Sequence, residues 1–363
     1  MRSGIRKRLD DLYIWIENNY RAYNRTKQVK RTLKLMDGGN KKNDNHYQEY
    51  LEYWKKYGQK PNKRWLRLYA KDSEEFNPRY VPDNLWFRDI IPYFSNTEFR
   101  RPYEDKNMHS TIFTNVDRPR TIVKCMAGLY YDPAGNLITK QEGLELLRKE
   151  TSAIIKPSVD SGEGRLIQFY DKSKESEDEL NKKLEVVGDN FIAQEILTQH
   201  EKMKSLNPNT LNTIRVLSLL FKEEVHILSI IARMGSGSSR VDNVSAGGIQ
   251  VTVNHDGTFS KYGFDKKRNK FDKHPDTKVI FEDFAIPGFD EVINKVKEQH
   301  VKLPHFKIVG WDFAIGEKGN PVFIEFNSCP GSNQMTGGPT FGDITEEVLQ
   351  EVYIDKNFAN ARN

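Results

Sequence analysis

The sequence has few cysteines and no long apolar run. Only two cysteines, Cys125 and Cys329, occur among the 363 residues, and their sequence contexts are unrelated. This number is too small for a disulfide scaffold or a Cys-rich metal site, and it favours a reducing, cytoplasmic location. No run of 18 apolar residues is present, so no transmembrane helix is predicted. The N-terminus also lacks the continuous apolar segment of a secretory signal.

Other signatures are missing too. The chain has no P-loop motif G-x-x-x-x-G-K-[ST], no internal repeat, and none of the glycine and aromatic patterning of RNA-binding sheets. These absences argue against a P-loop nucleotide site, a repeat architecture and an RNA-binding sheet, and we expect no nucleic-acid partner. Hydrophobic residues make up 37% and charged residues of both signs 29%, which predicts a soluble globular protein.

Charge is distributed unevenly along the chain. Residues 1–70 contain 18 Lys and Arg against 7 Asp and Glu, a net charge of +11, whereas the remainder carries −6. A basic segment of this kind can contact anionic lipid, a nucleotide-linked sugar or nucleic acid. We expect mainly a solvated helical surface. The alternative is peripheral contact with the inner face of the membrane or with a glycosyltransferase.

Hydrophobic periodicity predicts an α+β fold. Ile5, Leu9, Leu12 and Ile16 recur at helical spacing, and another helix is expected over residues 289–300. Residues 176–179 have the form of a capping box that opens a helix. Apolar runs predict strands at residues 121–123, 153–156, 191–195, 214–221 and 225–231. We predict a basic helical region over 1–75, an N-terminal α/β part over 76–150, a small subdomain over 151–200 and a C-terminal subdomain over 201–363.

The strongest chemical signal lies near the C-terminus. Residues 309–315 and 322–327 alternate as strands do, and the turn sequence 316–320 separates them. In such a hairpin Glu325 and Asn327 project from one face, and Asp312 can meet them from the partner strand. A divalent cation offsets the cost of burying carboxylates, and Mg²⁺ prefers carboxylate and amide oxygens. These three residues are therefore predicted metal ligands; the alternative is an edge hairpin whose carboxylates face solvent.

Two further strands end in loops that suit anions. Lys156 is followed by the small-residue loop 158–164, where a lysine charge and backbone N–H groups can bind phosphate. Arg233 is followed by a Gly/Ser-rich loop that reaches Asn243 and then Gly247 and Gly248, and arginines beside such a loop can clamp anions. An ordinary surface loop is the alternative interpretation of either pattern.

In their order and spacing these motifs resemble the ATP-grasp superfamily, and most of all its sugar-transfer-associated branch, over about residues 75–350. The run from Glu325 to Gly331 is similar to the E-x-N-x-x-P-G run of dipeptide ligases. The resemblance implies an ATP-grasp fold, in which two α/β subdomains with antiparallel sheets clamp ATP. It implies ATP and Mg²⁺ as cofactors, with two metal ions and Mn²⁺ as a substitute.

The resemblance also implies roles for individual residues. Gly310 stands where dipeptide ligases have an arginine, so Arg215 or Arg233 is expected to stabilise the oxyanion instead. A structural role is the alternative for His200. The implied nucleotide contacts are Lys106, Lys156, Ser161, Gly162, Gly164, Gln194, Glu195, Leu197 and His200; the implied catalytic residues are Arg215, Arg233 and Asn243; and the implied metal ligands are Asp312, Glu325 and Asn327.

The function implied is that of an ATP-dependent carboxylate–amine ligase that forms an amide through an acyl phosphate. The family's association with bacterial surface polysaccharides suggests a sugar acid or amino acid as the carboxylate and a small amine as its partner, in capsule biosynthesis. Two alternatives stay open. One is a phosphotransferase that acts on a sugar or small-molecule hydroxyl, and the other is a non-catalytic nucleotide-binding scaffold.

Overall fold

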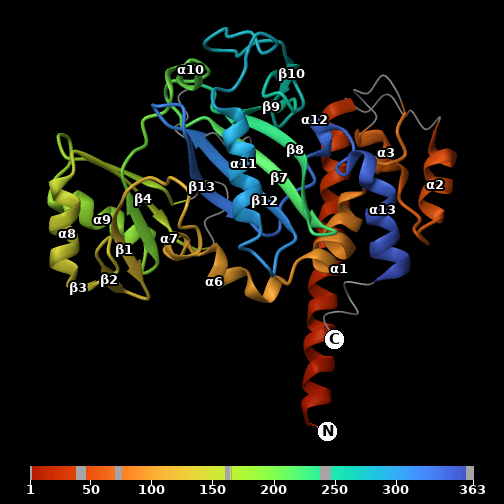
Figure 1. Cartoon of the computed structure of the whole chain (residues 1–363), viewed down its shortest axis with the longest axis horizontal. Helices are drawn as coiled ribbons and strands as arrows, with labels where there is room; N and C mark the ends of the chain where they lie inside the picture. The colour runs from red at the N-terminus through yellow and green to blue at the C-terminus, as the bar shows by residue number, and fades with distance from the viewer. Residues whose placement is uncertain are drawn as a thin grey trace.

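The computed structural model describes residues 2–37, 46–69, 76–159, 164, 166–237 and 247–356. Within them the chain forms three parts that lie side by side (Figure 1): a small sheet with two helices, a larger central sheet, and a group of helices from both ends of the chain. Both sheets are antiparallel, so the predicted α+β class is confirmed.

The small sheet has the strand order β3-β2-β1-β6-β4-β5. Helix α8 packs on β1 and β2, and α9 packs on β4 and β5. Capping boxes begin both helices, Thr139 with Glu142 and Ser176 with Glu179, and the second confirms the prediction. The elements are β1 (Thr121–Met126), β2 (Leu129–Tyr131), β3 (Leu137–Ile138), α8 (Lys140–Lys149), β4 (Ser152–Pro157), β5 (Gln168–Asp171), α9 (Glu177–Val187) and β6 (Phe191–Gln194).

The domain boundary expected between residues 150 and 151 falls inside this sheet. Strands β1 to β3 precede it and β4 to β6 follow it, and β6 pairs with β1 on one side and with β4 on the other. Because these ladders join both halves of the segment 121–194, the structure places these residues in one structural unit. Sequence periodicity cannot show which strands pair.

The large sheet has the strand order β11-β10-β9-β8-β7-β12-β13. Helix α11 (Phe289–His300), which begins and ends where it was predicted, packs across β7, β8, β12 and β13. The predicted neighbours at 214–221 and 225–231 are the paired strands β7 and β8. The strands are β7 (Thr213–Phe221), β8 (Glu224–Met234), β9 (Ile249–Val253), β10 (Phe259–Phe264), β11 (Lys270–Phe271), β12 (Ile308–Ile315) and β13 (Pro321–Asn327).

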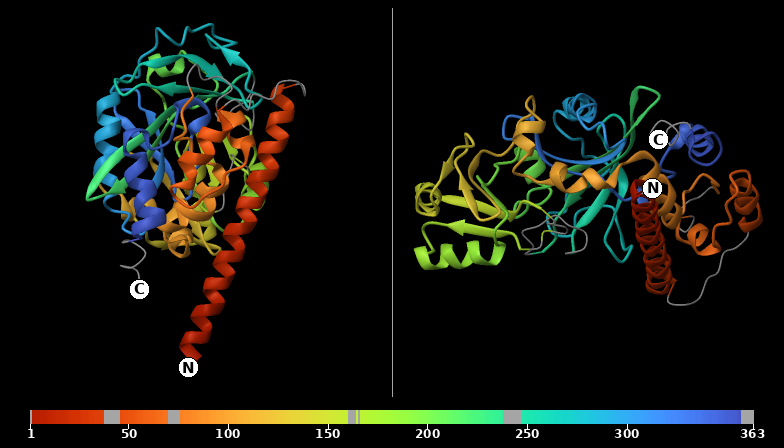
Figure 2. Two further views of the ribbon diagram at one scale, coloured as in Figure 1. Left: turned by 90° about the vertical axis from the view of Figure 1, so that its right-hand side faces the viewer. Right: turned by 90° about the horizontal axis from the view of Figure 1, so that it is seen from below.

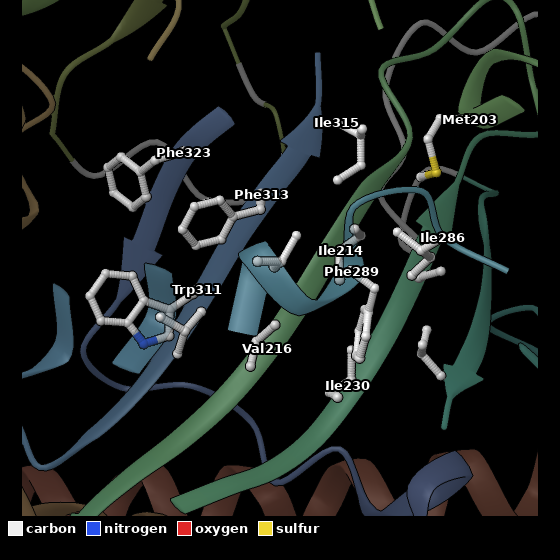
Figure 3. Close-up of a cluster of buried hydrophobic side chains, with 14 of the residues drawn as sticks. Met203, Ile214, Val216, Ile230, Ile286, Phe289, Trp311, Phe313, Ile315 and Phe323 are labelled. Carbon is white, nitrogen blue, oxygen red and sulfur yellow. The ribbon is translucent and has the colours of Figure 1, made fainter. Parts of the chain in front are cut away.

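The main hydrophobic core lies between the large sheet and α11 (Figure 3). Strand side chains alternate between the two faces of a sheet, so residues two apart on a strand share one face. Trp311, Phe313 and Ile315 of β12 accordingly all lie in this core, together with Phe323 of β13. The opposite face of β12 carries Asp312, which is therefore directed away from α11.

The third part is helical and covers the other face of the large sheet. Its core joins Trp86, Ile90 and Phe94 to Leu217 and Leu219 of β7. The remaining helical elements, including the short α10 that follows β6, are α1 (Arg2–Asp37), α2 (Tyr47–Lys55), α3 (Lys63–Tyr69), α4 (Asp83–Leu85), the π-helical turn η2 (Trp86–Ile90), α5 (Ile91–Phe94), the 3₁₀ turn η3 (Thr97–Phe99), α6 (Arg100–Glu104), α7 (His109–Ile112), α10 (Glu201–Lys204), α12 (Gln334–Gly337), the 3₁₀ turn η6 (Gly342–Ile344), α13 (Thr345–Gln350) and the π-helical turn η7 (Glu351–Asp355).

Helix α1 extends beyond the rest of the molecule. Its C-terminal half packs on α3, α4 and η2 through Ala22, Val29 and Leu33, whereas its N-terminal half projects away from the body (Figure 2). Across the part of the chain that the structure describes, no helix combines the length and apolarity needed to cross a bilayer.

Candidate active site

The predicted site residues meet where the small sheet faces β13 of the large sheet. The backbone N–H of Lys106 donates to the carbonyl of Ser158, just after β4, at 2.9 Å. The Lys106 ammonium reaches across to the carboxylate of Glu325 on β13, at 3.1 Å. A narrow pocket opens beside this pair and is lined by residues of both sheets: Lys106, His109, Ser110, Arg118, Thr121, Ile192, Gln194, Phe323 and Ile324.

The predicted hairpin of β12 and β13 is confirmed. Asp312 lies directly opposite Glu325, and Gly310 lies opposite Asn327. The two carboxylates and the Asn327 amide therefore share one face, because residues two apart on a strand project to the same side. A β-bulge follows Asp312, so that Ile324 is the extra residue between the pairs Asp312–Glu325 and Phe313–Phe323. Because of the bulge, the Phe323 side chain lies in the core, whereas the Glu325 side chain lies at the site.

Asp312 is 1% exposed and binds both predicted catalytic arginines. Arg215, its neighbour on β7, donates from Nε to Oδ1 at 2.8 Å and from Nη2 to Oδ2, as a bidentate fork. Arg233 of β8 reaches Oδ2 at 3.0 Å and also donates to the Thr213 hydroxyl. The arginines expected to act on an oxyanion thus lie beside the predicted metal ligand.

Glu325 is influenced by the charges of two lysines. Burial alone would raise the pKa of its carboxyl, but the charges of Lys106 and Lys156 lower that pKa to about 2. Burial, with the nearby charge of Lys106, lowers the pKa of the Lys156 ammonium to about 8. Two carboxylates therefore face four cationic side chains, a net charge of +2 that suits a polyphosphate.

Because the pKa of Lys156 is depressed, we predict that the expected binding of ATP beside it depends on pH. A phosphate group favours the ammonium form, so affinity should be highest below pH 8 and should fall as the pH rises through 8 and the free protein loses this proton. One linked proton corresponds to about a tenfold loss of affinity per pH unit above that value. Calorimetric titration with ATP across this range measures the slope.

The variant Lys156→Arg is the matched control, because a guanidinium stays charged throughout the range. It should bind ATP with a flatter pH profile than the wild type. An affinity of the wild type that does not change through pH 8 would contradict a phosphate contact of Lys156.

The side chains of Asp312, Glu325 and Asn327, on one face of the β12–β13 hairpin, are of the kinds that bind a divalent cation. Two carboxylates and one carboxamide are the oxygen ligands that Mg²⁺ prefers. The Asn327 Nδ2 is buried and has no hydrogen-bond partner among the described residues, so this amide is not committed to another contact through that atom. Arg215, Arg233 and Lys106 occupy carboxylate oxygens on this face, and they must shift for a metal ion to bind there.

Among the residues predicted to bind the nucleotide, Gln194 lines the pocket and donates from its side chain to the carbonyl of Pro119. Glu195 is held by Arg120, whose guanidinium also forms a bidentate pair with Glu150. Leu197 is partly exposed in the segment after β6. The structure thus places Gln194 at the pocket and Glu195 and Leu197 just beyond the end of its strand.

His200 has a structural contact. Its Nδ1 accepts the backbone N–H of Lys202 at the start of α10, and its own backbone N–H donates to the carbonyl of Ile315. These contacts favour the structural alternative given above.

Some predicted residues lie outside the described part of the chain. Ser161 and Gly162, and likewise Asn243, belong to this group. Gly164 is described and has a φ of 72°, a left-handed conformation that favours glycine. Gly247 has a φ of 99° where the chain enters β9.

Gly310 explains why this chain lacks the arginine found there in dipeptide ligases. A Cβ atom at this position would lie 2.9 Å from the Cβ of Pro330, closer than packed carbon atoms approach each other. A side chain would therefore displace the loop that follows Asn327. Arg215 of β7 and Arg233 of β8 bring positive charge to the same face of the sheet, where both bind Asp312.

Two residues at the site were not predicted from the sequence. His109 lines the pocket, and its Nε2 is buried with no partner among the described residues. Burial, with the charges of Lys106 and Lys156, lowers the pKa of this imidazole well below its ordinary value, so it is neutral. Arg118 lines the same pocket and donates to the carbonyl of His109. The only sequence signal for His109 is its spacing of three residues from Lys106.

Residues 104–349 match the family described as sugar-transfer associated ATP-grasp. No protein with a curated description matches the chain. Among solved structures, it is similar to D-alanyl-alanine synthetase A from Vibrio cholerae, with 11% identity and a TM-score of 0.43 over 71% of this chain and 65% of that one. It is also similar to the D-alanine–D-alanine ligase from Bacillus anthracis complexed with ATP, with 16% identity and a TM-score of 0.41 over 74% and 70% of the two chains.

The chain thus spans less than two thirds of the length of the Vibrio cholerae synthetase. The family match covers more than half of the chain and includes both lysines, both arginines and the hairpin of the site. The chain therefore belongs to the sugar-transfer-associated ATP-grasp family.

Proposed function

We propose that the protein is a carboxylate–amine ligase, which uses ATP to activate a carboxylate as an acyl phosphate and passes the acyl group to an amine. The observation that carries this proposal is the convergence of Lys106, Lys156, Arg215 and Arg233 on the carboxylates of Asp312 and Glu325. Four positive charges around two carboxylates suit a reaction in which phosphate oxygens and a second anion must be held together.

The lysines are assigned to the nucleotide. Lys106 forms an ion pair with Glu325 and the charge of Lys156 also acts on this carboxylate, so both charges would neutralise phosphate oxygens as the γ-phosphoryl group moves to the carboxylate. The Ser158 hydroxyl is buried with no partner among the described residues and is available to such an anion. Catalysis by these groups is positioning and electrostatic stabilisation rather than covalent chemistry.

The arginines are assigned to the second substrate. Arg215 and Arg233 present planar, permanently charged groups that can bind a carboxylate or the oxyanion formed when the amine attacks the acyl phosphate. Asp312 holds both guanidinium groups in place in the absence of substrate. Their position on β7 and β8 separates them from the lysines of the small-sheet side.

Asp312, Glu325 and Asn327 are the residues that would hold Mg²⁺. When bound, the ion would neutralise phosphate charge and help to orient the triphosphate. We further propose that the carboxylate belongs to a sugar acid or an amino acid of surface polysaccharide biosynthesis. Family membership supports this substrate class, and no side chain described above selects one member of it.

Hydroxylamine trapping tests the reaction class. The enzyme is incubated with ATP, Mg²⁺, hydroxylamine and a panel of uronic and amino acids, and products are identified by mass. A hydroxamate together with ADP supports the ligase, because hydroxylamine intercepts an acyl phosphate. A phosphate ester with no hydroxamate would show phosphotransfer to a hydroxyl instead. ATP binding without ADP formation under every condition would contradict an enzymatic role.

A further inference from the structure

Over residues 9–23, helix α1 carries an apolar stripe that does not pack against the body. Leu9 and Ile16 are 61% and 52% exposed, and Leu12, Tyr20 and Tyr23 are also more than half exposed. At about 100° per residue, these five positions fall within an arc of about 80°. Large apolar side chains grouped in this way on an exposed helix mark an interaction surface.

This stripe is a different face from the one that packs on the body. The buried residues of α1 are Ala22, Val29 and Leu33. At about 100° per residue, they centre about 120° around the helix from the exposed stripe. The stripe is therefore not an extension of the hydrophobic core, and closer packing of α1 on the body would not cover it.

The charge and the residue types of α1 indicate what kind of partner binds the stripe. Helix α1 contains ten Lys and Arg against four Asp and Glu, a net charge of +6. Lys27, Lys30 and Lys34 are exposed. Trp15 is 62% exposed and lies about 60° around the helix from the edge of the stripe, on the side that faces the body at Leu33, and Tyr20 lies within the stripe. Basic residues with Trp and Tyr beside aliphatic side chains are typical of helices that lie in the interface of an anionic membrane.

We propose that the projecting part of α1 docks the protein on an anionic lipid surface. Like charges oppose the pairing of two such helices, which disfavours a second copy of this chain as the occupant. The N-terminal part of α1 projects away from the body, beyond the other helices and strands (Figure 2). This proposal rests on α1 alone and is independent of the reaction proposed above.

Tryptophan fluorescence gives a direct test. Of the five tryptophans, Trp54, Trp65, Trp86 and Trp311 are at most 2% exposed, so Trp15 is the one whose surroundings would change. Vesicles of phosphatidylcholine with phosphatidylglycerol should shift its emission to shorter wavelength and co-sediment the protein. Vesicles of phosphatidylcholine alone should do neither. The variant Trp15→Phe should lose the emission shift.

Substitutions locate the surface. The double variant Leu9→Glu and Ile16→Glu should lower partition into anionic vesicles by at least about tenfold, because each change removes an apolar side chain from the contact. Its matched control is Leu129→Glu with Ile280→Glu, which adds the same charge at half-exposed positions on the body and should bind as the wild type does. Replacing Lys27, Lys30 and Lys34 by Gln should also weaken binding by about tenfold or more.

Three results would overturn the proposal. The first is equal binding of the wild type to both kinds of vesicle, or to neither. The second is wild-type binding by the Leu9→Glu and Ile16→Glu variant. The third is that the wild type forms a dimer without lipid and does not bind vesicles, whereas this variant is a monomer. The stripe would then bind a second copy of the chain. Unfolding midpoints check that the variants fold, and the sites lie outside the core.

Discussion

The variant Glu325→Gln is expected to lower kcat/KM for ATP-dependent product formation by about 100- to 1000-fold, the range seen when one preorganised electrostatic group is removed from an active site. Glu325 supplies a negative charge that acts on Lys106 and Lys156, and its carboxylate is one of the proposed metal ligands. The amide keeps the shape of the side chain but lacks the charge. Steady-state kinetics at several Mg²⁺ concentrations measure the loss.

The matched control is Glu317→Gln, the same chemical change in the exposed turn between β12 and β13. It should keep wild-type turnover. Circular dichroism should show the same fold for both variants. If Glu325→Gln turns over ATP as the wild type does, Glu325 is not a metal ligand and the assignment of the hairpin face is wrong.

Asp312→Asn is expected to cause the largest loss of stability among substitutions at the site. The carboxylate is buried and holds Arg215 and Arg233, and an amide would leave two guanidinium groups without a counter-charge. Breaking a buried ion pair from one side costs about 3–5 kcal/mol. The Arg215 side chain is 22% exposed and can turn to water, so we expect the lower end of that range. Urea unfolding measures the free energy.

Asp283→Asn serves as its control, because Asp283 is exposed and the change is chemically the same. A surface change of this kind should stay within about 0.5 kcal/mol of the wild type. Equal stability of Asp312→Asn and Asp283→Asn would mean that the two arginine pairs contribute nothing to the folded state. The two arginine pairs would then be important only if their loss lowers activity.

Local pattern was sufficient to predict the hairpin and the helix beside it. The alternation around Asp312 and Glu325, with a turn sequence between the strands, indicated both strands and the shared face. The apolar periodicity of residues 289–300 indicated α11. The bulge at Ile324 could not be predicted, because an apolar residue there fits either face of a strand whose neighbours are also apolar.

The contacts between distant residues depend on topology. Arg215 and Asp312 are 97 residues apart and meet because β7 pairs with β12. The pocket position of His109 depends on how α7 packs between the two sheets, and no spacing rule specifies that. The resemblance to a family indicated the candidate site residues. Their ion pairs depend on which strands lie side by side, and only the structure shows this.

Lys106 forms contacts on both sides of the boundary between the two sheets. Its backbone is bonded to the loop after β4, and its ammonium reaches β13. Separating the small sheet from β13 would break either this ion pair or the backbone hydrogen bond, so both contacts favour the arrangement in which the two sheets lie close together. In the reaction proposed above, a triphosphate that binds Lys106 would compete with Glu325 for this lysine and so weaken the link between the two sheets.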